Sequence, residues 1–81
     1  MTQARDIQRL IEAGIPGAQV RVVGDDGRHF EALVVSKEFV GKSLVQQHHM
    51  VYRALGEHMR EAIHALSLRT LTPDQHADAG R

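Results

Sequence analysis

The sequence has no cysteine and no tryptophan, and it has few aromatic residues and few prolines. The absence of cysteine excludes disulfides, thiol catalysis and any metal site built only from thiolates of this chain. The three aromatic residues are Phe30, Phe39 and Tyr52. A small chain with so few aromatic side chains has little with which to line an enclosed pocket, and this argues against an enzyme that acts on a small molecule.

Neither sign of charge is in excess, since ten Lys and Arg residues balance ten Asp and Glu residues. This balance argues against strong nonspecific binding to nucleic acid or to acidic membranes, although it allows a local basic patch. The first residues, MTQARDIQRLIEAG, contain no long apolar run. We therefore expect neither a signal peptide nor a membrane span, and we expect a cytoplasmic protein.

The chain has 81 residues, of which 42% are apolar, and this predicts a single domain over residues 1–81 with one modest core. Apolar residues at helical spacing predict a first helix over about 3–13, with Gly14 as the C′ residue that ends it. The runs QVRVV (19–23) and HFEALVVS (29–36) are typical of strands. The segment GDDG between them predicts a hairpin turn, in which Asp26-Gly27 favours positive φ.

Ser43 and Gln46 form a capping-box pattern that begins a helical region over about 43–61, as one helix or two joined ones. Its predicted apolar stripe comprises Leu44, His48, Val51, Leu55, Met59 and Ala62. HALSLRTL (64–71) returns to the alternation of a strand. Thr72 as N-cap, Pro73 at the first helical position and Gln75 then predict a short last helix, and ADAGR (77–81) is expected to fray.

These elements predict an α+β fold with the order α-β-β-α-β-α. Because a helix connects the second and third strands, these strands are expected to be parallel in a three-stranded mixed sheet with helices packed on one face. No glycine-rich phosphate loop leads from a strand into a helix, and neither Ser36 nor Ser43 lies in a G-x-S-x-G context. Asp25 and Asp26 are explained by turn geometry, so we predict that the protein is not an enzyme.

Six histidines are many for a chain of this length. His48 and His49 are adjacent on a helix and point about 100° apart, so they cannot chelate one ion together. His48 is expected to be packed and hydrogen-bonded, because it lies on the apolar stripe. His49 and His58 are expected to be solvated, and His76 lies near the fraying end.

His29 and His64 differ because each lies at the entry to a predicted strand. If these strands are parallel, both imidazoles lie at the same edge of the sheet. Two nitrogens make half of a four-coordinate site, and imidazole suits zinc, copper, nickel or iron. The alternative is that both are ordinary surface residues.

Several motifs in order resemble the BolA family: VVS-x-x-F-x-G-K, the His48 region followed by V-x-x-x-L, and IHAL-x-L-x-T-x-TP. The hairpin GDDGRHFEALVV is most similar to the IbaG-like branch, and the resemblance covers nearly the whole chain. It implies a KH-like fold of the class II type. It also implies a heterodimer with a monothiol glutaredoxin, in which the two proteins share a [2Fe-2S] cluster for iron-sulfur cluster trafficking, assembly or iron homeostasis.

In such a pair the glutaredoxin and a bound glutathione each supply a thiolate, and the BolA side supplies the histidine of the IHA motif, here His64. The hairpin loop often supplies a second ligand, here His29. A cysteine-free chain is compatible with this arrangement, and histidine ligation tends to raise the cluster potential. A weak homodimer of the chain is a further expectation left open.

The resemblance also implies a second role, a DNA-binding transcriptional regulator of a stress or envelope response. The chain departs from the family pattern at two places: Gln47, His48 and His49 stand where the family commonly has Arg-His-Arg, and His76 stands where it commonly has tryptophan. The first departure removes positive charge from the helical region. A third alternative is an interaction module whose histidines bind nothing.

Overall fold

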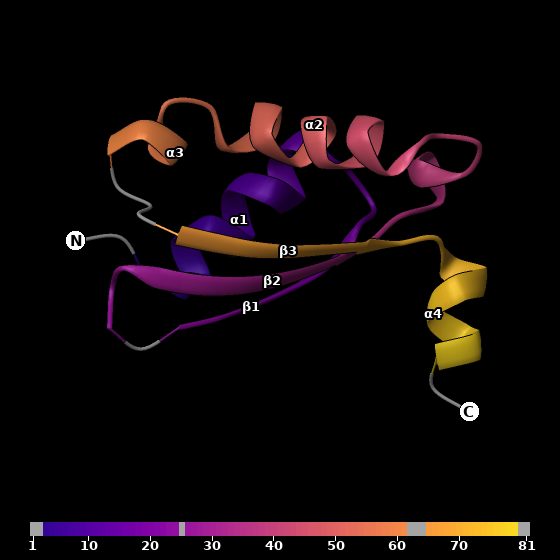
Figure 1. Ribbon diagram of the computed structural model, residues 1–81, viewed down its shortest axis with the longest axis horizontal. Helices are drawn as coiled ribbons and strands as arrows, with labels where there is room; N and C mark the ends of the chain where they lie inside the picture. The colour runs from indigo at the N-terminus through magenta and orange to yellow at the C-terminus, as the bar shows by residue number, and fades with distance from the viewer. Residues whose placement is uncertain (1–2, 25, 62–64, 80–81) are drawn as a thin grey trace.

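The predicted order of elements is confirmed in the computed structural model of the chain, which describes residues 3–24, 26–61 and 65–79 (Figure 1). The elements are α1 (Ala4–Gly14), β1 (Gln19–Val23), β2 (His29–Val35), the 3-10 turn η1 (Lys37–Phe39), α2 (Leu44–Leu55), α3 (His58–Glu61), β3 (Ala65–Leu71) and α4 (Pro73–Ala79). The helix α4 therefore includes residues 77–79, which the sequence places in the frayed end.

The sheet has the order β1-β2-β3, with β1 antiparallel and β3 parallel to β2. This is the predicted mixed sheet, and the long connection through α2 accounts for the parallel pair. Figure 1 shows α1 and α2 on one side of the sheet. It also shows α4 beyond the end of β3, at the opposite end of the sheet from the turn between β1 and β2. The fold is the KH-like α-β-β-α-β-α arrangement that was predicted.

The core lies between the two long helices and the inner face of the sheet. Alternate residues of β2 point inward, as the period of two requires, and α1 and α2 each contribute residues one turn apart. The buried cluster consists of Ile7, Ile11, Ile15, Val22, Phe30, Ala32, Val34, Phe39, Val51 and Leu55.

The inward face of α2 differs from the predicted stripe. Gln47, Val51 and Leu55 are buried, whereas Leu44 is 61% exposed. The prediction that Leu44 begins the inward face was wrong. A polar residue, Gln47, occupies the first inward position and is hydrogen-bonded there. Ala62 lies outside the described residues. The helical region is divided in two, since α2 ends at Gly56 with φ +57°.

Gly14 ends α1 for a reason other than the predicted one. It is the last residue of the helix, and the described part of the chain has positive φ at Gly17, Gly27, Gly41 and Gly56 but not at Gly14. A Cβ added at Gly14 would overlap the Cβ of Ala54 and lie 3.0 Å from its Cα. Gly14 is therefore required by the close approach of α1 to α2 and not by a left-handed conformation.

We expect Gly14→Ala to lower the free energy of unfolding by about 1–3 kcal/mol, because the added methyl group overpacks the contact between α1 and α2. Urea denaturation measures this loss. Ala54→Gly removes the opposing methyl group, so the double variant should be less destabilised than the sum of the two single variants. If the changes in unfolding free energy of the two single variants simply added in the double variant, the close contact between Gly14 and Ala54 would be contradicted.

Candidate metal-ligand site

His29 is the first residue of β2, and its side chain is 70% exposed. Its register partner across the parallel pair is Ala65, the first residue of β3. The backbone N–H of Ala65 donates to the carbonyl of Arg28 over 3.1 Å. The prediction that β2 and β3 begin at the same edge of the sheet is therefore confirmed. His64 directly precedes Ala65 in the chain and lies outside the described residues.

Asp26 organises the turn that leads into His29. Its Oδ1 accepts hydrogen bonds from the backbone N–H groups of Arg28 and His29, both over 2.8 Å. This is the Asx-type turn that aspartate favours. The predicted positive φ is confirmed at Gly27, where φ is +75°, but it was wrong for Asp26, whose φ is not positive. Asp26 thus serves the turn, as the sequence indicated.

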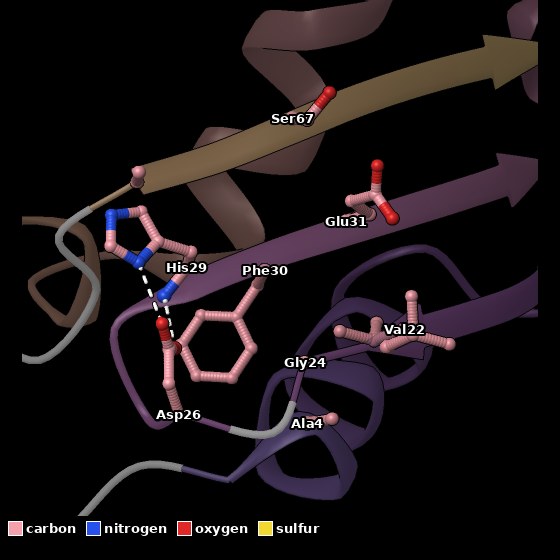
Figure 2. Close-up of a pocket in the computed structure, with 10 residues that line it drawn as sticks. Ala4, Val22, Gly24, Asp26, His29, Phe30, Glu31 and Ser67 are labelled. Atoms are coloured by element: carbon pink, nitrogen blue, oxygen red, sulfur yellow. Dashed lines mark hydrogen bonds and ion pairs between the residues drawn. The ribbon is translucent and has the colours of Figure 1, made fainter.

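The same carboxylate also holds the imidazole, which the sequence did not predict. Oδ2 of Asp26 lies 2.8 Å from Nδ1 of His29 (Figure 2). Three hydrogen bonds stabilise the anion and hold the pKa of the Asp26 carboxyl well below its usual range. The largest cause is the backbone N–H of His29, followed by its ring and by the backbone N–H of Arg28. Both oxygens therefore accept hydrogen bonds within the turn.

The other ring nitrogen of His29 is the available one. Among the described residues, none forms a hydrogen bond with Nε2. In Figure 2 the ring stands at the start of β3 with its Nδ1 side turned to Asp26, so Nε2 lies on the opposite side of the ring. A neutral imidazole with the proton on Nδ1 has its lone pair on Nε2, which is the donor a transition metal requires. His29 therefore fits a metal ligand that is presented outward.

The described part of the chain does not complete a metal site. It contains no group of three or more His, Asp or Glu residues that could hold an ion together. Beside the turn, an open hollow is lined on one side by Asp26 and His29 and on the other by Glu31 and Ser67 (Figure 2). Ligands from a second molecule therefore have open access to His29.

The other described histidines do not join this site. The ring of His48 packs edge-to-face on Tyr52 at 6.4 Å between centroids, and its Nε2 is buried with no hydrogen-bond partner in the described part of the chain. The predicted packing of His48 is confirmed, but the hydrogen bond expected for its ring is not formed at Nε2. His49 and His58 are exposed, as predicted, and His76 is exposed on α4.

The family of BolA-like proteins matches residues 12–75, which is most of the chain, and the protein belongs to this family. It is 50% identical over 71 residues to the human BolA-like protein 2, and the match covers 88% of this chain and 81% of that protein. The solved structure of a BolA protein homologue from Coxiella burnetii is similar with a TM-score of 0.85 and 45% identity, covering 95% of this chain and 99% of the other.

Other relatives are longer or match over a shorter part. The chain spans 14% of the SufE-like protein 1 and 38% of the protein BOLA1 of Arabidopsis thaliana, at 45% and 41% identity. A Haemophilus influenzae relative named DNA-binding transcriptional regulator BolA is 38% identical over 47 residues, which cover 58% of this chain and 46% of that protein. The family is thus shown, and the IbaG-like branch stays a prediction. None of the helices in the described ranges has the length and apolar character needed to cross a bilayer.

Proposed function

We propose that the protein is an adaptor that pairs with a monothiol glutaredoxin and shares a [2Fe-2S] cluster with it. The observation that carries the proposal is the geometry of His29 in a chain of the BolA-like family. Its ring is exposed, its Nδ1 is held by Asp26, and it lies beside the first residue of β3. His64 directly precedes that residue in the sequence.

The donor chemistry supports a shared site over one built by this chain alone. The chain has no cysteine, and its described residues offer no group of three ligands. Two imidazoles would ligate one iron, and the glutaredoxin and a bound glutathione would supply thiolates. In this proposal the protein holds, delivers or senses the cluster in the cytoplasm and catalyses no reaction itself.

The proposal predicts that His64→Ala abolishes a mixed cluster. Under anaerobic conditions, the protein is added to a [2Fe-2S]-loaded monothiol glutaredoxin with glutathione, and visible absorption and circular dichroism are recorded. We expect wild type to form a one-to-one complex with a changed cluster spectrum, because imidazole replaces another iron ligand. His64→Ala should lose the new spectrum, and His29→Ala should weaken or shift it.

His76→Ala is the matched control, since His76 is an exposed histidine on α4, at the opposite end of the sheet from His29 (Figure 1). It should behave as wild type. No complex and no spectral change with wild type would overturn the proposal. Loss of the spectrum with His76→Ala as well would show that the effect is not specific to the turn end of the sheet.

The alternative function is DNA-binding transcriptional regulation, which the name of the Haemophilus influenzae relative favours. The balanced charge of the chain provides no general attraction to DNA, so such binding would depend on a local surface. Sequence-specific, salt-sensitive DNA binding that persists in His64→Ala would favour this alternative over the cluster adaptor.

A further inference from the structure

Asp26 makes two kinds of contact with two different oxygens. Oδ1 accepts the backbone N–H groups of Arg28 and His29, and Oδ2 faces Nδ1 of the His29 ring at 2.8 Å. The first contacts are sufficient to form the turn. The contact with the ring is an additional feature, and a purely structural turn residue does not require it.

An ionised carboxylate only accepts hydrogen bonds, so the proton between Asp26 and the ring belongs to Nδ1. In the neutral ring this leaves the lone pair on Nε2, the exposed nitrogen. Histidines that bind metals commonly donate their other N–H to a carboxylate, which fixes the tautomer and the ring orientation. We propose that Asp26 is a positioning residue for the metal ligand His29, because it holds the proton on Nδ1 and directs Nε2 toward the shared cluster. This inference rests on the proposed function.

Asp26→Asn separates positioning from turn formation. The asparagine Oδ1 can accept the same two backbone N–H groups, and asparagine is as common as aspartate in such turns. Its side-chain NH₂ replaces Oδ2 and can only donate, so Nδ1 must become the acceptor. The ring proton then moves to Nε2, the nitrogen that the proposal assigns to iron. The substitution keeps the number of non-hydrogen atoms and leaves the backbone of the turn in place.

The first measurement uses the apo protein and needs no cluster. Nitrogen-15 NMR of the imidazoles, recorded about two pH units above the ordinary histidine pKa, distinguishes the two neutral tautomers. We expect the His29 of wild type to carry its proton on Nδ1 and that of Asp26→Asn to carry it on Nε2. A wild-type ring protonated on Nε2, or the same tautomer in both proteins, would overturn the role of Asp26.

The second measurement titrates the same proteins into cluster-loaded monothiol glutaredoxin with glutathione. Asp26→Asn should weaken formation of the mixed complex about 10- to 100-fold, as is usual when the partner of a metal-bound histidine is lost. Glu31→Gln is the charge control, because it removes one negative charge from the strand that begins at His29, at a residue that lines the same hollow, and no hydrogen bond joins Glu31 to the ring among the described residues. It should weaken formation of the mixed complex clearly less than Asp26→Asn does.

The outcomes separate the two proposals. If wild type forms the complex and Asp26→Asn forms it equally well despite a changed tautomer, the positioning role is wrong and the adaptor function stands. If Glu31→Gln is weakened as much as Asp26→Asn, negative charge near the turn and not the hydrogen bond is responsible, which also overturns the positioning role. If wild type forms no complex, the adaptor function fails, and the ligand role of His29 fails with it.

Discussion

Phe39→Ala is expected to lower the free energy of unfolding by about 3–5 kcal/mol, because it removes a fully buried aromatic side chain and leaves a cavity. Phe39 is 0% exposed and belongs to the core cluster, although it lies in η1 between β2 and α2. A domain of this size has a total stability of roughly 5–15 kcal/mol, so the loss is a large fraction of it. Urea denaturation followed by far-UV circular dichroism measures the change.

Two variants define what the result means. Phe39→Leu keeps most of the side-chain volume and should cost less, about 1–2 kcal/mol. The next residue, Val40, is 64% exposed, and Val40→Ala should change stability by no more than about 0.5 kcal/mol. Equal losses for Phe39→Ala and Val40→Ala would show that the segment after β2 is not anchored in the core.

The element order was predictable because its signals are local. The alternation in β1, β2 and β3 and the capping boxes at Ser43 and Thr72 require only residues a few positions apart. Both boxes form: Ser43 exchanges hydrogen bonds with Gln46, and Thr72 exchanges them with Gln75. The shared edge of β2 and β3 followed from one further step, the parallel crossover through α2.

Two contacts were not predicted from the sequence. One depends on how the helices pack in the tertiary structure, and the other on which atoms of one side-chain pair form a hydrogen bond. Gly14 is required by the close approach of α1 to Ala54, which lies forty positions further along the chain in α2. The ring contact of Asp26 could have been predicted, since an Asx turn bonds the carboxylate to the backbone two residues on, at Arg28, and so places it next to His29. Its consequence for the His29 tautomer required the ring geometry.

Gln47 is the clearest case of a tertiary effect. In the sequence, Gln47 is one of the positions where the helical region lacks a positive charge, but the residue is 7% exposed and its Oε1 accepts a hydrogen bond from Thr70 in β3. The side chain at this position is buried, so the absence of a positive charge here does not change the exposed surface of α2. His49, two positions on, is exposed, so the positive charge missing at that position is missing from the surface of α2.

We expect Gln47→Glu to lower the free energy of unfolding by about 3 kcal/mol at pH 7, although the two side chains have nearly the same shape. The amide group donates from Nε2 to the carbonyls of Lys42 (3.0 Å) and Phe39 (3.3 Å), and Oε1 accepts from the Thr70 hydroxyl at 2.7 Å. It thereby ties the segment before α2 to β3. A carboxylate at this place would point an anion at two carbonyl oxygens and lose both donors.

This variant should show a characteristic dependence on pH. Burial and the facing carbonyls raise the pKa of the new carboxyl in the folded state above that of an ordinary glutamate. The folded protein therefore binds the proton more tightly than the unfolded chain. Stability is lost as the pH rises from about 4.3 to the raised pKa of the folded state, by about 1.4 kcal/mol for each unit, and stays constant above that pKa. Denaturation midpoints of variant and wild type should converge as the pH is lowered toward 4.

Gln46→Glu is the matched control, since it makes the same change at the neighbouring residue. Gln46 is exposed, and its Oε1 accepts the Ser43 N–H at 2.8 Å, a bond that a carboxylate accepts equally well. A negative charge in the first turn of α2 is also favourable, so this variant should match wild type or gain about 0.3–1 kcal/mol. If Gln47→Glu resembled this control and showed no dependence on pH, its side chain would have left the core. The hydrogen bonds of Gln47 would then not be what fixes the segment before α2 against β3.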